Sequence, residues 1–461
     1  MAEAHRTPTT TGPAGTTKRA AGSRGAALGL AAAIALVLVA AIVPPLTGWD
    51  VNARSPRASA SGELAPTHGF WDPRVGVGSV PAVLLALLGW RYAAAYAGRL
   101  AWRPLLLTAY GVALAWLLSL ALVDGEAGIS RVLAHGYEYL ETAREVDDVR
   151  ALLEGFVPRI SPDHPDNWVT HVAGHPPGAL LLFVGLVRVG LGGDLAAGLV
   201  VTGAAASVAP AVLVTLRALG AEAAARRAAP FLVLGPAAVF MAVSADAVFA
   251  AFAAWGLAAL AVAATRSGRG AAVGWSVAAG LLLGSCVMLS YGLPLLGFLA
   301  LAVLAVARSW RPLPVAAAAA SAVVLAFAAA GFAWWEGLPA VHERYWRGLA
   351  ADRPAAYWMW ANLAALVVSA GPALGAGLGR LVELGRRAER SVLLLVAGAA
   401  AAVVVADLSR MSKAEVERIW LPFVPWLLLA TALLPERWRR PLLALQVTVA
   451  VVMEHLLYTT W

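Results

Sequence analysis

Histidines and prolines stand together at the border between a polar stretch and an apolar run. The segment THVAGHPPG at 170–178 carries His171 and His175 and ends in a Pro-Pro pair. Proline pushes the residue before it out of the α region, yet it is tolerated in the first turn of a helix. We therefore predict that this segment is the corner where a loop turns into a membrane helix, with both histidines at its mouth.

Metal binding by this segment is not predicted. His171 and His175 are four residues apart, which would suit zinc on a regular helix, but Gly174 and the two prolines argue against such a helix. Cys286 is the only cysteine and lies in an apolar run, so it forms neither an internal disulfide nor a cysteine-based metal site. Carboxylate pairs could hold a divalent cation, although their spacing does not require one. No cofactor is assigned.

Charged residues elsewhere could carry out acid–base chemistry and bind an anion. A carboxylate can take a proton from an acceptor hydroxyl, and arginine or lysine can hold a phosphate leaving group. The candidate catalytic carboxylates are Asp50, Asp124, Glu126, Glu138 and Asp148. The candidate substrate-binding residues are His171, His175, Asp246, His342, Arg344, Lys413 and Arg418. Simpler roles compete with these: Asp124 could cap a helix or loop, and either Asp147 or Asp148 could be a solvated helix charge.

The composition indicates the environment in which these residues lie. Hydrophobic residues make up 60% of the 461 residues and charged residues 13%, and the mean hydropathy is +0.73. A soluble protein cannot hide that much apolar surface, so we predict an all-α, polytopic bundle of transmembrane helices. The net charge of +8 comes from short basic clusters between apolar runs. That pattern is typical of cytoplasmic loops and does not indicate nucleic-acid binding.

Hydropathy also predicts a topology. Roughly 20 residues per crossing gives about fourteen apolar segments, or about thirteen spans if 177–191 crosses only partly. Residues 1–24 are expected to form a disordered cytoplasmic tail and 25–461 one transmembrane domain in a bacterial plasma membrane. Arginine clusters then mark the cytoplasmic side, and four loops fall outside: 47–78, 124–176, 335–357 and 407–418.

The loop 124–176 is long for a connection between spans. Ile129–Phe156 carries apolar residues at helical spacing but is too polar to span, which fits one or two amphipathic helices at the membrane surface. A structured loop of about fifty residues is unusual unless it has a function. We therefore expect 124–176 to be an extracytoplasmic catalytic loop.

The order of these features resembles the GT-C superfamily of integral-membrane glycosyltransferases. An acidic pair (Asp124, Glu126) follows an early span, a long external loop ends in HPPG at 175–178, and SADAVFAAF at 244–252 resembles a Ser-x-Asp-Ala-Leu-Phe element of such enzymes. KAEVERIWLPFVPWLL at 413–428 is similar to a stretch of uncharacterised actinobacterial membrane proteins of this type. The resemblance implies a GT-C fold, a polyprenyl-phosphate-linked sugar donor, and an acceptor that is a cell-envelope glycan or lipid.

The resemblance also implies roles for particular residues. Asp124 or Glu126 would match the first-loop acid that acts as general base, and His175 would match the corner residue near the donor phosphate. Two predicted spans, within 26–97, come before the span that ends at Asp124, whereas the family usually has the acid after its first span, so Asp50 in the first loop is a rival base. The implied reaction is a single displacement in which polyprenyl phosphate leaves.

Two other classes remain open. A multi-span transporter or lipid flippase would need a broken or polar site near the midplane and an inverted repeat. No repeat is evident, and Arg188 and Asp194 are the charges nearest to the midplane. A non-catalytic scaffold for envelope assembly would tolerate mutation of its outer carboxylates.

Overall fold

Helices make up almost all of the computed structural model, which describes residues 14–53 and 64–459. The first half of the chain forms α1 (Ala14–Thr47), α2 (Ser79–Arg99), α3 (Trp102–Ala121), η1 (Leu122–Asp124), α4 (Ala127–Ser130), α5 (Tyr139–Arg144), α6 (Val149–Glu154), η2 (Pro158–Ile160), α7 (Thr170–Gly174), α8 (Pro177–Arg188), α9 (Asp194–Ala206), α10 (Val208–Ala218), α11 (Glu222–Val233) and α12 (Ala237–Met241).

The second half continues in the same way. Its helices are α13 (Ala245–Thr265), α14 (Arg269–Leu289), η3 (Leu293–Leu295), α15 (Leu296–Ala307), α16 (Leu313–Ala329), α17 (Trp334–Trp346), α18 (Ala355–Ala370), α19 (Ala373–Leu384), η4 (Gly385–Arg387), α20 (Arg390–Leu408), α21 (Val416–Ile419), α22 (Val424–Leu427), η5 (Leu428–Leu433) and α23 (Glu436–Leu456). The short strands β1 (Gly69–Trp71) and β2 (Leu457–Thr459) pair antiparallel, with Phe70 opposite Tyr458. The chain is thus nearly all-α, as predicted.

Fewer helices than expected are long and apolar enough to cross a bilayer. Within the described residues there are seven, or nine if two bent pairs, α16 with α17 and α18 with α19, each count as one span. Three further apolar helices are shorter: Pro177–Arg188, Leu293–Ala307 and Val424–Leu433. Hydropathy alone does not separate such short segments from full spans, so the expected thirteen spans are not confirmed. The helices support a membrane-embedded protein.

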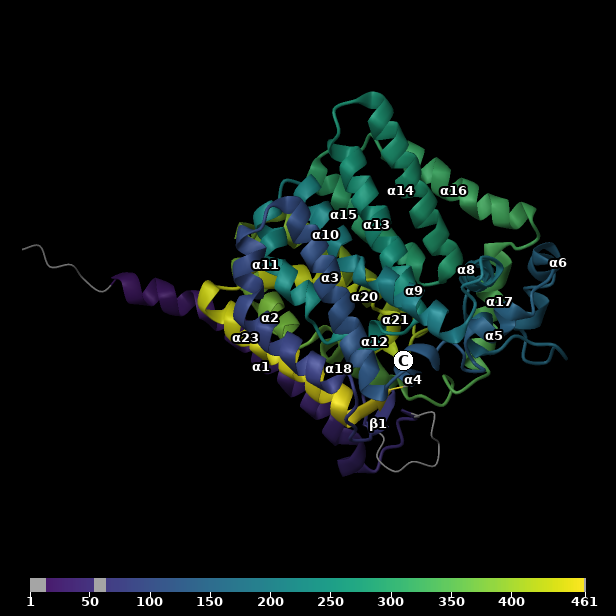
Figure 1. Cartoon of the computed structure of the whole chain (residues 1–461), viewed down its shortest axis with the longest axis horizontal. Coiled ribbons are helices and arrows are strands. Elements are labelled where there is room, and N and C mark those ends of the chain that lie inside the picture. The colour runs from purple at the N-terminus through teal and green to yellow at the C-terminus, as the bar shows by residue number, and fades with distance from the viewer. Residues whose placement is uncertain (1–13, 54–63, 460–461) are drawn as a thin grey trace, which may run out of the picture.

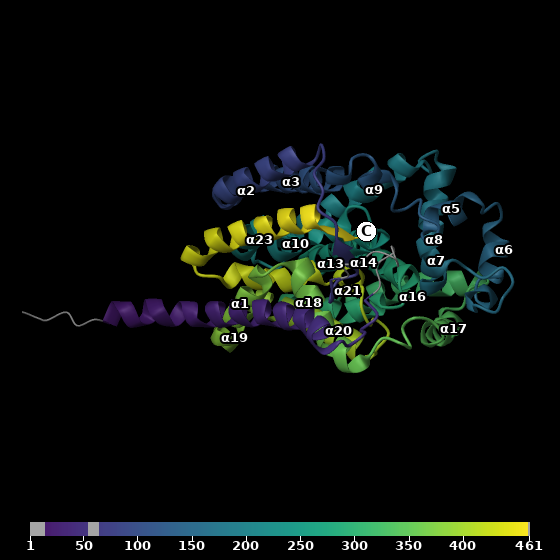
Figure 2. The ribbon, with the colours of Figure 1, turned by 90° about the horizontal axis from the view of Figure 1, so that it is seen from below.

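The first helix starts earlier than expected. Residues 1–13 of the expected tail lie outside the described residues, whereas α1 begins at Ala14 and runs to Thr47. It packs along α19 through glycines: a Cβ on Gly29 would meet the carbonyl oxygen of Gly375 at 2.1 Å. This close approach fixes α1 against the body of the molecule, and both ribbon views show it along one edge (Figures 1 and 2).

Arginines gather at one end of the bundle, which we call the arginine-rich end. Arg226 donates to the carbonyls of Ala97 and Leu100 at 2.9 Å, and Arg227 pairs with Glu389 at 3.0 Å. Arg390 donates to the carbonyl of Ala305 at 3.0 Å. These contacts bring the α2–α3, α10–α11, α15–α16 and α19–α20 connections together, as a common cytoplasmic side would require.

The predicted outer loops meet at the opposite end, which we call the loop end. Asn52 donates to the carbonyl of Asp352 at 3.1 Å, and the backbone N–H of His68 donates to Glu417 at 2.7 Å. Arg344 on α17 donates to the carbonyls of Ile160 and Trp168 at 2.7 and 2.9 Å. Segments from all four predicted outer loops are therefore in contact, and they carry most of the candidate site residues.

The corner at 170–178 forms largely as predicted. α7 stops at Gly174, His175 is extended (φ −129°, ψ 153°), and Pro177 begins α8. α8 has 12 residues, which is about 18 Å at 1.5 Å per residue and too short for a hydrocarbon core of about 30 Å. Arg188 at its far end donates to the carbonyl of Asp147 at 3.1 Å. Both ends of α8 thus contact the same loop, in line with the expected partial crossing.

The external loop folds into short helical pieces. Within Ile129–Phe156, where we expect one or two amphipathic helices, it forms α5 and α6 after the end of α4; η2 and α7 follow, and each piece has three to six residues. The chain turns around Gly136, and Asp148 starts a new helix as its N-cap. The apolar spacing nevertheless identified its buried face, because Leu133, Leu140 and Phe156 are each 0% exposed. Both ribbon views show α5, α6 and α17 together at one side (Figures 1 and 2).

Candidate functional site

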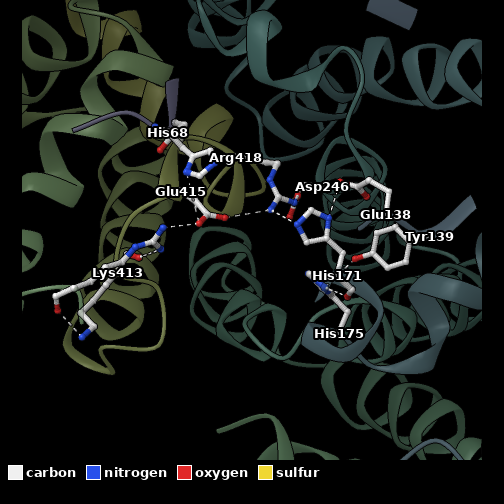
Figure 3. Close-up of polar contacts among 11 residues, drawn as sticks. His68, Glu138, Tyr139, His171, His175, Asp246, Lys413, Glu415 and Arg418 are labelled. Atoms are coloured by element: carbon white, nitrogen blue, oxygen red, sulfur yellow. Dashed lines mark hydrogen bonds and ion pairs between the residues drawn. The ribbon is translucent and has the colours of Figure 1, made fainter. Parts of the chain in front are cut away.

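The loop end contains a buried group of charged side chains that we call the His171 cluster. Its members are Glu138, His171, Asp246, Glu415 and Arg418. Glu138 directly precedes α5, His171 lies in α7, Asp246 in the first turn of α13, and Glu415 and Arg418 at α21. α13 is the most buried of the candidate spans, at 78% of its apolar window. The cluster is thus built on the core helix, and Figure 3 shows its side chains pointing toward one another.

Glu138 and His171 form a close carboxylate–imidazole pair in this cluster. His171 Nδ1 lies 2.6 Å from Glu138 Oε1, and the side chains are 14% and 8% exposed. Burial alone would raise the pKa of Glu138, but the His171 ring and its hydrogen bond hold this pKa below its usual value. The ionised carboxylate therefore accepts a hydrogen bond from His171 Nδ1, which leaves Nε2 facing Arg418.

Arg418 joins this pair to two further carboxylates. Its Nη1 donates to Asp246 at 2.5 Å, while its Nη2 lies 3.5 Å from His171 Nε2 and 3.9 Å from Glu415. Burial would lower the pKa of Arg418, but Asp246, Glu138 and Glu415 keep it raised, so the guanidinium stays charged. A buried guanidinium with Nη2 between a histidine and a carboxylate is suited to recognising a phosphate or carboxylate group.

Glu415 is held by a strained backbone segment. Ala414 and Glu415 both have left-handed φ values of 68° and 62°, which are uncommon for residues other than glycine. Arg353 donates to Glu415 at 2.9 Å and to the carbonyl of Lys413 at 2.6 Å, and Asn362 accepts the N–H of Ala414 at 3.1 Å. Such strain, fixed from several sides, is concentrated at functional sites in proteins.

Glu417 is the one carboxylate beside the cluster that favours its protonated form. It is 0% exposed, and Oε1 accepts the backbone N–H of His68 at 2.7 Å. Oε2 is buried without a hydrogen-bond partner in the described chain. Burial raises the pKa of Glu417 to about 7. A proton can therefore be stored at this position near neutral pH, next to Arg418 of the cluster.

His175 lies behind His171 rather than in the ion pairs. Its Nδ1 contacts the Tyr139 hydroxyl at 2.8 Å and the carbonyl of His171 at 2.9 Å. Tyr139 in turn stacks on Phe183 of α8, with ring centroids 5.2 Å apart. Burial lowers the pKa of His175, so this ring is neutral. His175 fixes the backbone that presents His171, as Figure 3 shows.

Three other predicted substrate-binding residues lie outside the cluster: two hold loops together, and one contacts its own helix. Lys413 donates to the carbonyl of Arg353 at 2.7 Å and lies 4.5 Å from the Trp346 ring centroid. Arg344 donates to the loop carbonyls of Ile160 and Trp168. His342 is exposed and accepts the indole N–H of Trp346 at 3.1 Å. Of the predicted binders, His171, His175, Asp246 and Arg418 meet at one place.

Asp124 belongs to a separate group that we call the Arg74 cluster: Arg74, Asp124, Arg131 and Glu454. Arg74 pairs with Asp124 and, at 3.1 Å, with Glu454, while Arg131 lies 3.7 Å from Asp124. Both guanidinium groups also face the Tyr458 ring, at 5.3 and 5.2 Å from its centroid. The cavity beside them holds about 20 Å³, enough for about one water molecule.

The remaining predicted carboxylates have local contacts. Asp50 accepts the N–H of Asn52 at 2.9 Å, and Asp148 caps α6 by accepting from Arg150 and Ala151 at 2.8 and 3.2 Å. Glu126 is exposed. The structure therefore brings only Glu138 of the five candidate bases into the His171 cluster.

Several residues that complete the site were not among the candidates. Glu415 and Glu417 stand in the AEVER stretch beside Arg418, so their sequence signal was present. His68 and Arg353 come from other predicted outer loops, and nothing in their local pattern distinguishes them. Residues 14–53 and 64–459 contain no group of three or more His, Cys, Asp or Glu side chains that could hold a metal ion. No protein-family model, curated protein or solved structure matches this chain.

Proposed function

We propose that this chain is a membrane glycosyltransferase of the GT-C type, which moves a sugar from a polyprenyl-phosphate donor to a cell-envelope glycan or lipid. The observation that carries the proposal is the Glu138–His171 pair next to Arg418. It combines a general base, oriented by a carboxylate at 2.6 Å, with an anion-binding guanidinium 3.5 Å away. The apolar helices around it suit a lipid-linked substrate.

The proposed reaction is a single displacement. His171 Nε2 takes the proton of the acceptor hydroxyl, and the resulting oxygen bonds to the anomeric carbon. The bond between that carbon and the phosphate oxygen breaks, and polyprenyl phosphate leaves with the electron pair. Arg418 Nη2 binds the phosphate in place of its long contacts with His171 and Glu415, while Asp246 holds the guanidinium at 2.5 Å. Glu138 stabilises the imidazolium as it forms.

This proposal replaces the expected carboxylate base with His171, which Glu138 orients. The expected bases Asp124, Glu126, Asp50 and Asp148 lie outside the His171 cluster, and Asp124 is already paired with Arg74 and Arg131. The loop end would face outward and the arginine-rich end the cytoplasm, as in a bacterial plasma membrane protein with the N-terminus inside.

A transporter is the second candidate, because α18 and α19 are bent by 109° at a short break. Broken helices bind substrates in many transporters. Here Gln446 fills the break: it accepts the N–H of Ala373 at 3.0 Å and donates to the carbonyl of Ala370 at 2.9 Å. The backbone groups that would bind an ion are thereby satisfied within the protein, which favours the enzyme.

The test is sugar transfer by the purified full chain in liposomes, with a panel of radiolabelled polyprenyl-phosphate sugars and an envelope lipid extract as acceptor. Transfer from one donor, lost in Arg418→Lys, is expected, because lysine lacks the bidentate fork. The exposed Arg347→Lys is the matched control. No transfer from any donor by folded protein, together with donor-independent movement of a lipid or solute across the bilayer, would support the transporter.

A further inference from the structure

A long apolar groove lies on the flank of the bundle, away from both charged clusters. It encloses about 540 Å³ between α2, α3 and α11, within the range of pockets that bury a small ligand. Its lining is almost entirely apolar and includes Leu88, Tyr92, Tyr96, Val112 and Leu234. α2 itself is only 22% buried over its apolar window. The groove therefore opens toward the surface that the bilayer covers.

The groove ends at a basic turn. Leu100, in the connection between α2 and α3, lines that end, and Arg99 and Arg103 flank the connection. Both arginines are exposed, and neither forms an ion pair with a carboxylate of the described chain. Tyr92 and Tyr96 are 44% and 56% exposed along the same half of α2. Tyrosine and arginine side chains in this arrangement suit the headgroup region of a bilayer.

The turn that carries these arginines is fixed in place. Arg226 of α11 donates to the carbonyls of Ala97 and Leu100 at 2.9 Å and pairs with Glu222 at 2.7 Å. Arg217 lies 4.5 Å from the Trp102 ring centroid. Inside the groove the packing between α2 and Leu234 is equally tight, because a Cβ on Gly89 would meet the Leu234 side chain at 2.3 Å. The groove and its basic end are thus held by the protein itself, which lowers the cost of binding a ligand.

We propose that this groove binds one anionic phospholipid from the leaflet at the arginine-rich end. One acyl chain occupies the apolar channel, and the phosphate lies at Arg99 and Arg103. Charge complementarity selects the anionic lipid. The two unpaired arginines next to the apolar channel attract a net negative headgroup more strongly than a zwitterionic one. The site is separate from the His171 cluster, so the inference does not depend on sugar transfer.

Native mass spectrometry of the full chain in detergent tests this directly, with phosphatidylglycerol and phosphatidylcholine titrated in parallel. The wild type is expected to retain one phosphatidylglycerol in preference to phosphatidylcholine. Arg99→Gln/Arg103→Gln should weaken phosphatidylglycerol by about fivefold for each arginine removed and leave phosphatidylcholine unchanged. The matched control is Arg266→Gln/Arg269→Gln, an exposed arginine pair at the α13–α14 turn, which should bind like the wild type.

A second variant tests the channel. Thr108→Trp places an indole in the groove from an exposed lining position, and it should abolish retention of both lipids. Equal binding of the two lipids by the wild type, or an equal loss in both arginine pairs, would overturn the proposal. If Thr108→Trp does not elute as a monodisperse species, the two arginine pairs still decide the outcome.

Discussion

The His171 cluster and the Arg74 cluster lie at the same end of the molecule and are built from similar residues, yet they are organised differently. In the Arg74 cluster two arginines face two carboxylates, next to a cavity of about 20 Å³. In the His171 cluster a histidine stands between a carboxylate and an arginine, at 2.6 and 3.5 Å. In the first arrangement burial raises the pKa of Glu454 to about 8, beside the two guanidinium groups. Only the second arrangement places a histidine between a carboxylate and a guanidinium.

Their positions in the fold explain this difference. Arg74 connects the ends of α3 and α23, and the β1–β2 pair lies beside it. It fastens elements that would otherwise separate. Arg418 connects α13 with the external loop through Asp246 and His171. We infer that the Arg74 cluster supports the fold and that the His171 cluster carries the chemistry.

The largest loss of stability is expected from Arg418→Met. It leaves Asp246, only 5% exposed, without its charged partner, and breaking a buried pair in this way costs about 3–5 kcal/mol. The apparent Tm in detergent should fall strongly. Arg418→Met/Asp246→Leu is the control and should recover much of the loss. An unchanged Tm in the single variant would show that this pair is not buried as described.

Glu417 should make stability depend on pH. Its pKa in the folded chain is about 7, against 4.5 for the unfolded chain. The contribution of Glu417 to the free energy of unfolding is therefore full below pH 4.5 and is lost as the pH rises through 7, which leaves the wild type with a stability penalty at higher pH. Glu417→Gln removes this penalty and should be more stable than the wild type at pH 8 by roughly 2–3 kcal/mol, with no gain near pH 4.5. The apparent Tm of both proteins between pH 4.5 and 8 measures the effect. A constant difference across this range would contradict the assignment.

Asp124→Asn should affect stability and leave the chemistry intact. The neutral amide cannot form charge-assisted bonds to Arg74 and Arg131, so about 1–3 kcal/mol of stability should be lost. Sugar transfer at a temperature well below the Tm should stay at the wild-type rate. Lost transfer at an unchanged Tm would place Asp124 in the reaction instead.

The smallest effects are expected at the two peripheral carboxylates. Asp148→Ala removes the N-cap of α6 and should cost about 1 kcal/mol. Glu126→Gln, at an exposed side chain, should stay within about 0.5 kcal/mol of the wild type. Both variants should transfer sugar normally. A large loss of transfer in either one, measured alongside Tm, would move the reaction centre toward the start of the external loop.

Sequence reasoning found the helical membrane class, the loop end and part of the site. Proline geometry at Pro176 and Pro177 predicted the corner, and the charges of Asp246 and Arg418 were conspicuous in apolar surroundings. It favoured Asp124 or Glu126 as the base because both follow an early span, as the resemblance to the GT-C superfamily implies. The ion-pair partner of Asp124, Arg74, is 50 residues away, and Arg353 and His68 reach Glu415 and Glu417 across 62 and 349 residues. Pairing at such separations depends on the packing of the helices, which local patterns do not encode.

The most direct test is the rate of sugar transfer by His171→Asn and Asp124→Asn, measured side by side against wild type from pH 5 to pH 9, with the Tm of each protein. His171→Asn should lower kcat by about 10²–10⁴-fold at temperatures below its Tm, the usual worth of a general base. Asp124→Asn should keep both the rate and the profile. Full activity in His171→Asn combined with loss of transfer in Asp124→Asn would contradict the assignment of the reaction to the His171 cluster.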